Sequence, residues 1–123
     1  MRPWIVLAGL SGLMAVGMGA YGAHGLAGEA DAQALVAQAA NYQIIHALAL
    51  LGADRITVDT RRGGGMLAHG AALLFALGMA LFCGSLYVKA LTGAPLAVPM
   101  VTPAGGMTLM AGWLVLALAG FRK

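Results

Sequence analysis

The fold class is decided by residues 66–87, which read MLAHGAALLFALGMALFCGSLY. In this stretch only His69 and Ser85 are clearly polar. A helix of about 20 residues, rising 1.5 Å per residue, crosses the roughly 30 Å hydrocarbon core of a bilayer. We therefore expect a transmembrane helix over these residues.

Small residues recur at every fourth position of this segment and make one side of the predicted helix nearly flat. Such a side lets another helix approach closely. A shorter series of the same kind runs along the first apolar segment of the chain. We expect the two series to form the main helix-packing surfaces. The residues assigned to packing are Ser11, Ala15, Gly19, Ala72, Ala76, Ala80 and Gly84.

The composition extends this interpretation to the whole chain of 123 residues, of which 61% are hydrophobic and 9% charged. Soluble domains carry about 25% charged residues, so lipid must be the solvent for most of this chain. We predict a single membrane domain over residues 1–123, an all-α bundle of four transmembrane helices. The predicted spans are residues 4–21, 34–52, 66–87 and 104–121, each within a few residues.

Three segments separate the apolar runs and are predicted to be loops: residues 22–33, 53–65 and 92–106. Asp31 is expected to cap the second helix, because its carboxylate can accept hydrogen bonds from free N–H groups. Thr102 followed by Pro103 is typical of an N-cap with proline at the first helical position.

The basic residues indicate how the chain crosses the membrane. Lys89, just before the third loop, is the only Lys or Arg on the side of the first and third loops. The other six lie at the termini and in the middle loop: Arg2, Arg55, Arg61, Arg62, Arg122 and Lys123. Basic segments stay in the cytoplasm, so we expect both termini there, in an inner-membrane protein. This distribution favours membrane orientation over nucleic-acid binding. A signal peptide over residues 4–21 is the competing interpretation, but the run is long and lacks a good cleavage site.

The second predicted helix carries most of the polar residues at membrane depth. Gln38, Asn41, Tyr42 and His46 fall within about 140° of one helical face, and Gln43 lies further round. Polar side chains inside an apolar helix usually face a partner or a cavity. They could form interhelical hydrogen bonds, a proton-transfer, quinone or metal site, or the lining of a water-filled cavity.

Histidines are the residues most suited to a cofactor. If the second and third helices pack as a hairpin, His46 and His69 could approach each other and ligate a haem iron. However, no C-x-x-C-H motif is present and Cys83 is the only cysteine, so we expect no cofactor and no metal, with haem or quinone as the alternatives. No catalytic residue is assigned. The candidate polar site comprises His24, Gln38, Asn41, Tyr42, Gln43, His46, His69, Ser85 and Tyr87.

Four short pieces in a fixed order carry a family resemblance: GAHGL (22–26), YQIIHALALL (42–51), FCGSLY (82–87) and TPAGG (102–106). Together they resemble the YgdD-like family of small uncharacterised bacterial inner-membrane proteins, which is similar to eukaryotic transmembrane protein 256. The resemblance implies a four-helix membrane protein with a retained first helix, and no established activity.

The two small-residue series offer more flat packing surface than one small bundle needs. We therefore expect a non-enzymatic protein in contact with the lipid bilayer, acting as an accessory or assembly partner of a larger membrane complex or as a homo-oligomer. A cofactor- or proton-handling redox protein that uses the polar face of the second helix is the first alternative. A small transporter or channel is the second.

Overall fold

The computed structural model describes residues 1–58 and 64–121, which contain four α-helices and no strand. The helices are α1 (Pro3–His24), α2 (Ala30–Thr57), α3 (Gly64–Thr92) and α4 (Val101–Gly120). Each is long and apolar enough to cross a membrane. The prediction of an all-α, four-helix membrane protein is confirmed, and the outer surfaces of the helices contact the lipid bilayer.

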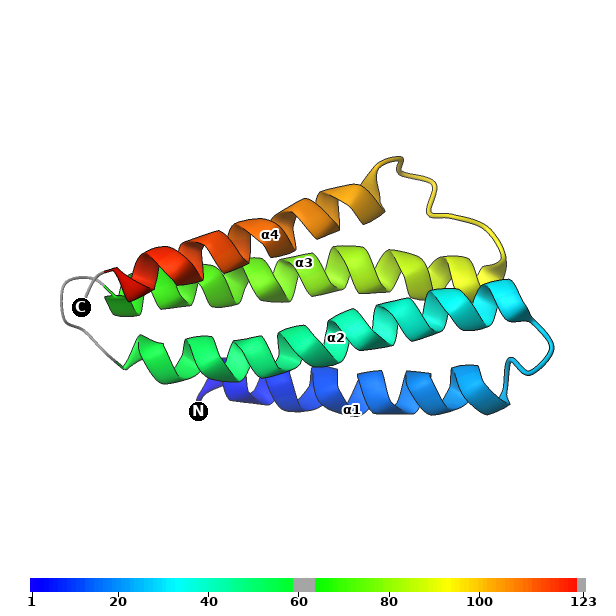
Figure 1. Cartoon of the computed structure of the whole chain (residues 1–123), viewed down its shortest axis with the longest axis horizontal. Helices are drawn as coiled ribbons and strands as arrows, with labels where there is room; N and C mark the ends of the chain where they lie inside the picture. The colour runs from blue at the N-terminus through cyan, green and yellow to red at the C-terminus, as the bar shows by residue number, and fades with distance from the viewer. Residues whose placement is uncertain (59–63, 122–123) are drawn as a thin grey trace.

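Each helix packs mainly against the next one in the sequence, so that α1 lies on α2, α2 on α3 and α3 on α4 (Figure 1). Half of the most apolar stretch of α3 is buried (50%), compared with 17% for α1 and for α4. The helix predicted from residues 66–87 is therefore the central element of the bundle. The described chain begins and ends at the same end of the bundle (Figure 1).

The buried core has two parts along the bundle. The first includes side chains from all four helices, among them Ala8, Leu50, Phe75 and Leu109. The second joins the end of α1 to α2 and α3 and contains the fully buried Val36 and Cys83. α1 contributes the buried Ala8 to the first part and the partly buried Met18 to the second, so it packs at the edge of both.

The loops are shorter than predicted, because all four helices extend into them. α2 begins at Ala30 and continues to Thr57, so much of the expected first and second loops is helical. The Ala-rich residues after Glu29 favour helix. At the other end, Asp54 is accommodated in the helix because its carboxylate Oδ2 lies 2.6 Å from Nη2 of Arg2.

The predicted cap at Asp31 is wrong. Glu29 occupies the N-cap position and makes no side-chain capping bond, and Asp31 lies in the first turn. There a carboxylate still interacts favourably with the positive end of the helix dipole. The α1–α2 connection is instead closed by Gln33, whose amide donates to the carbonyl oxygen of Gly22 at 3.0 Å.

The predicted cap at Thr102 is also wrong, because α4 begins at Val101, two residues before Pro103, and its N-cap is Met100 in a left-handed conformation (φ 68°). The Thr102 hydroxyl lies 2.6 Å from the hydroxyl of Ser85 on α3 and so links two helices. Pro103 is the third residue of the helix, where its missing N–H costs no intrahelical hydrogen bond.

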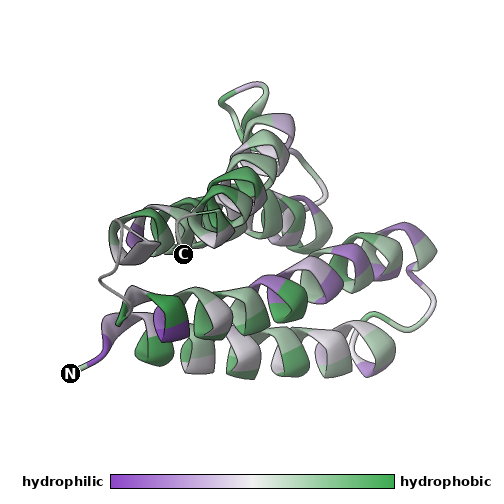
Figure 2. Cartoon of the chain, turned by 60° about the vertical axis from the view of Figure 1, so that its left-hand side comes forward, coloured by the Kyte–Doolittle hydropathy of each residue, from purple (hydrophilic) through white to green (hydrophobic). Residues whose placement is uncertain are grey.

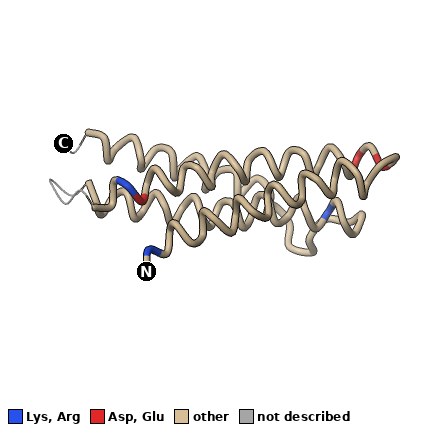
Figure 3. Tube along the Cα trace, turned by 90° about the horizontal axis from the view of Figure 1, so that it is seen from below, with Lys and Arg blue, Asp and Glu red and all other residues tan. Residues whose placement is uncertain are grey.

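Charged residues lie only near the two ends of the bundle in residues 1–58 and 64–121 (Figure 3). Arg2, Asp54 and Arg55 lie at the start of α1 and near the end of α2, and Glu29, Asp31 and Lys89 lie at the start of α2 and near the end of α3. α1 alone spans about 33 Å between these ends at 1.5 Å per residue. The uncharged band therefore matches the thickness of a bilayer, and only α2 carries hydrophilic residues far into it (Figure 2).

Candidate functional site

His46 lies at the centre of the polar residues of α2 and is buried, with 4% of its surface exposed. Its Nδ1 lies 2.7 Å from the carbonyl oxygen of Tyr42, and its Nε2 lies 2.9 Å from the indole Nε1 of Trp113 on α4. A carbonyl only accepts and an indole N–H only donates. The ring is therefore neutral with its proton on Nδ1, and both ring nitrogens are engaged.

Aromatic side chains surround His46 and join three helices. Tyr42 stacks on His46 with ring centroids 6.0 Å apart, which is the contact expected for residues four apart on a helix. Phe75 of α3 contacts both His46 and Trp113, with centroids 5.7 and 4.9 Å away. Phe82 contacts Tyr42 at 4.8 Å. We call these five residues the aromatic cluster.

An open groove of about 350 Å³ runs beside the aromatic cluster, between α2 and α4. Its walls are Tyr42, Phe82 and Trp113 together with Met107 and other α4 residues. Because both nitrogens of His46 are already hydrogen bonded, the groove presents aromatic and methionine surfaces without a free ring nitrogen. Ligation of a haem or metal by His46 would require it to give up one of these two bonds.

A second buried polar pair links α2 to α3 about one helical turn from His46. The hydroxyl of Tyr87 donates to Oε1 of Gln43 at 2.7 Å, and both side chains are buried. Gln43 lies outside the polar face predicted from the helical wheel, yet it faces the bundle interior. Nearby, Ser85 donates to the carbonyl oxygen of Phe82 at 2.9 Å and contacts Thr102.

His46 and His69 do not form a pair. His69 is exposed, and its Nδ1 accepts a hydrogen bond from Nε1 of Trp4 on α1 at 3.0 Å. Phe75, which contacts His46, is six residues from His69 in the sequence, or about 9 Å along the helix. The two histidines therefore lie at different depths. Each accepts from one of the two tryptophans of the chain, and His24 is exposed at the end of α1.

Tryptophan partners were not predicted from the sequence. Trp4 links α1 to α3, and Trp113 links α4 to α2. Both bonds join helices that are not consecutive in the chain. The sequence places two tryptophans and two histidines within the predicted membrane helices. These equal numbers do not say which residues meet.

Gln38 and Asn41 are exposed on α2 and take no part in the buried polar pairs, and Asn41 borders a hollow of about 270 Å³ between α1 and α2. The polar face predicted from the helical wheel is thus divided by the bundle. His46 is buried, Tyr42 borders the groove beside α4, and the two amides are exposed.

The small-residue series on α3 is covered over only part of its length. Ala68 and Ala72 are fully buried, whereas Ala76 and Gly84 are half-buried and Ala80 is exposed. On α1, Ala15 is buried, while Ser11 and Gly19 are half-buried.

An apolar groove of about 210 Å³ remains open between the uncovered half of the α3 series and α1. Ala76, Ala80 and Gly84 form one wall, and α1 contributes Ser11 and Met14. We call it the α1–α3 groove.

Close contact between α3 and α4 depends on glycines that the sequence interpretation missed. A Cβ on Gly105 would meet the backbone nitrogen of Phe82 and would lie 2.8 Å from its Cα. A Cβ on Gly112 would lie 2.8 Å from the ring of Phe75. The two glycines are two helical turns apart, so they share one face of α4, and this spacing was the signal available in the sequence.

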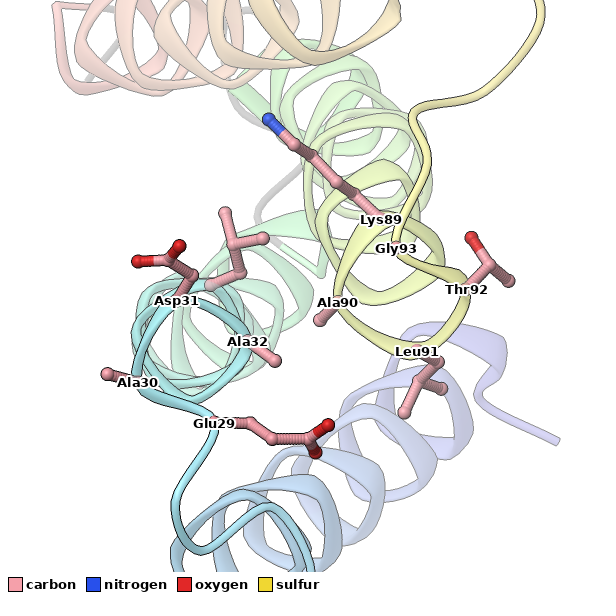
Figure 4. Close-up of a pocket in the computed structure, with 10 residues that line it drawn as sticks. Glu29, Ala30, Asp31, Ala32, Lys89, Ala90, Leu91, Thr92 and Gly93 are labelled. Carbon is pink, nitrogen blue, oxygen red and sulfur yellow. The ribbon is translucent and has the colours of Figure 1, made fainter.

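A wider hollow of about 640 Å³ lies at the end of the bundle, between the start of α2 and the end of α3 (Figure 4). Its charged residues are Glu29, Asp31 and Lys89. Their side chains point apart (Figure 4), so no set of polar groups converges in this hollow. Elsewhere in the described residues, no three His, Cys, Asp or Glu side chains gather closely enough to hold a metal ion.

The fold and these internally paired polar residues define a small polytopic membrane protein built as a helical bundle. The chain belongs to the family described as protein of unknown function DUF423, whose model matches residues 18–106. The resemblance inferred from four short sequence pieces is thereby confirmed.

Its relatives cover nearly the whole chain. It is 37% identical to a UPF0382 membrane protein of Staphylococcus haemolyticus, with 99% of this chain and 98% of the relative aligned. Identity is 33% to UPF0382 membrane protein YwdK of Bacillus subtilis, with coverages of 99% and 98%. It is 34% to UPF0382 inner membrane protein YgdD of Escherichia coli K12, with coverages of 98% and 91%. No solved structure matches the chain.

Proposed function

We propose that this protein is a non-enzymatic accessory protein that binds a transmembrane helix of a larger inner-membrane complex. The observation that carries the proposal is the α1–α3 groove. The small-residue series of α3 is covered at Ala72 and open at Ala80, in the middle of the same helix. A flat face that its own bundle leaves half uncovered is suited to a helix from another protein.

The chemistry of the groove fits such a partner. Small side chains allow backbones to approach closely, and van der Waals contact is a principal source of helix association in lipid. Ser11, which also lines the groove, offers a hydroxyl for an interhelical hydrogen bond. A partner helix can therefore gain both close packing and one polar contact.

The buried polar residues support a structural role over a catalytic one. His46, Gln43 and Ser85 each have a hydrogen-bond partner within the bundle. No polar side-chain atom that is buried in the described part of the chain lacks a partner. The interior polar groups are thus already used to hold helices together, as interhelical hydrogen bonds do in membrane proteins.

Replacing Ala80 with leucine should lower the recovery of partner proteins about tenfold, because overfilling a packed contact costs roughly 1–3 kcal/mol. Ala80 is exposed, so the substitution fills the groove without entering the core. The measurement is quantitative mass spectrometry of proteins that co-purify with the tagged chain from native membranes. Ala117→Leu is the matched control, because Ala117 is exposed on α4, outside the groove. Equal recovery from both variants and the wild type would refute the proposal.

We also infer that both termini face the cytoplasm in the inner membrane. Six of the seven Lys and Arg residues lie at the termini and near the α2–α3 connection, and such segments are retained in the cytoplasm. A green fluorescent protein fused to the C-terminus should fluoresce, and alkaline phosphatase fused there should be inactive. Fusions after Gly93, in the α3–α4 loop, should show the reverse. An active phosphatase at the C-terminus would contradict this orientation.

A further inference from the structure

The outward face of α2 is a continuous exposed stripe. Its members follow one another at alternating spacings of four and three residues, which is the spacing of a seam between two supercoiled helices. We call it the α2 outer stripe. It comprises Ala34, Gln38, Asn41, Ile45, Leu48 and Gly52.

Two members of this stripe are amides at bilayer depth. Asn41 is 11 residues after Ala30 and 16 before Thr57, or about 16 and 24 Å from the two ends of the helix. Gln38 is one turn away. Both residues therefore lie within the uncharged band of the bundle.

Neither amide has a hydrogen-bond partner within residues 1–58 and 64–121. The side-chain hydrogen bonds and ion pairs that α2 makes in the described residues involve Gln33, Gln43, His46, Asp54 and Thr57. An amide that faces hydrocarbon without a partner costs several kcal/mol. The stripe thus requires polar groups at the same depth from outside the chain.

We propose that the protein forms a parallel homodimer through the α2 outer stripe, with the Gln38 and Asn41 amides of the two copies hydrogen bonded across the interface. An amide both donates and accepts, so an identical amide is a complete partner for it. Two copies with the same membrane orientation are related by a two-fold axis along the membrane normal. This axis brings each residue of the stripe opposite its own counterpart, at the same depth.

The rest of the stripe fits the same arrangement. Ala34 and Gly52 are small and lie on either side of the amides, so the two α2 helices can approach closely. Ile45 and Leu48 continue the seam with apolar side chains. A polar residue within such a seam selects one register and one oligomeric state. The proposed dimer contact uses a different face of the protein from the α1–α3 groove. Its test is therefore independent of the test of the proposed function.

Cysteine cross-linking of the full chain in native membranes tests the dimer. The native thiol is first removed as Cys83→Ala, and Ile45→Cys then places a single thiol in the stripe. Oxidation should give a product of twice the chain mass. Its yield should be about tenfold above that of Leu114→Cys, an exposed thiol on α4, because only the stripe holds two thiols together. Equal yields from the two sites would overturn the proposal. So would a cross-linked product whose mass shows a different protein.

The amides are tested in the same cross-linking background. Gln38→Leu combined with Asn41→Leu should lower the Ile45→Cys yield about tenfold, since interhelical side-chain bonds in membranes average roughly 0.6 kcal/mol and reach about 1.7. Both positions are exposed, so the fold should persist, and circular dichroism and melting in detergent check this. An undiminished yield from the folded double variant would rule out the amide-bonded interface.

Discussion

Replacing Gly105 with alanine should destabilise the bundle by about 3 kcal/mol, the upper part of the range for overpacked sites. The new Cβ would meet the backbone nitrogen of Phe82 and would lie 2.8 Å from its Cα. Backbone atoms of a helix cannot turn aside as a flexible side chain can, so α4 would have to move away from α3. Equilibrium unfolding by SDS in mixed micelles, followed by tryptophan fluorescence, measures the change in unfolding free energy.

The adjacent glycine provides the control. A Cβ on Gly106 would lie 3.7 Å from the ring of Phe82, an ordinary van der Waals distance. Gly106→Ala should therefore be neutral or stabilising, because alanine favours a helix over glycine by up to about 1 kcal/mol. If Gly105→Ala and Gly106→Ala cost the same, the close α3–α4 contact described above is incorrect.

Trp113→Phe should cost about 2 kcal/mol of unfolding free energy, because it leaves a buried acceptor without its donor. Nε2 of His46 accepts only the indole N–H of Trp113, and His46 is held in place by its bond to the Tyr42 carbonyl oxygen. The ring therefore cannot turn to another partner without losing that bond. The same SDS unfolding assay measures the effect.

Trp4→Phe is the matched comparison, because Trp4 makes the same kind of bond to His69. His69 is exposed near the end of the bundle at which the chain begins, where water can replace the lost donor. The loss of unfolding free energy should therefore stay below about 1 kcal/mol. In a His46→Leu background the cost of Trp113→Phe should shrink, since the orphaned acceptor is gone. Equal costs for the two tryptophan variants would argue against a buried role for the Trp113 bond.

These tryptophan–histidine hydrogen bonds help to select a single arrangement of the four helices. Apolar packing between neighbouring helices in lipid discriminates weakly among rotations of a helix about its axis, because lipid tails are as apolar as leucine. The bonds from Trp4 and Trp113 join α1 to α3 and α4 to α2. They therefore constrain the cross-section of the bundle beyond what contacts between consecutive helices provide.

Membrane class and helix number were predictable because they depend on properties that a sequence displays directly. Residues 66–87 have the length and apolarity that a bilayer requires, and α3 spans Gly64–Thr92 around them. The helix ends were less predictable. Thr102 has the sequence of an N-cap, but its hydroxyl contacts Ser85 instead, and nothing in the local sequence shows that competing partner.

Of the residues named for the candidate polar site, the structure brings some together and leaves others apart. Tyr42 and His46 were expected to touch because residues four apart share a helical face, and their rings do stack. Gln43 was included in the candidate site although the helical wheel placed it away from the polar face, and it is buried against Tyr87. A wheel groups polar residues by angle, and it contains no information on which angle faces the neighbouring helices.

The sequence by itself determined that this chain is a four-helix membrane protein, because hydrocarbon thickness imposes length and apolarity on every span. Only the tertiary structure decided which polar side chains meet, which glycines admit another helix, and which half of the α3 series stays open. The reason is physical. A pair such as His46 and Trp113 depends on the rotation and depth of two helices relative to each other, and these are set by the packing of all four.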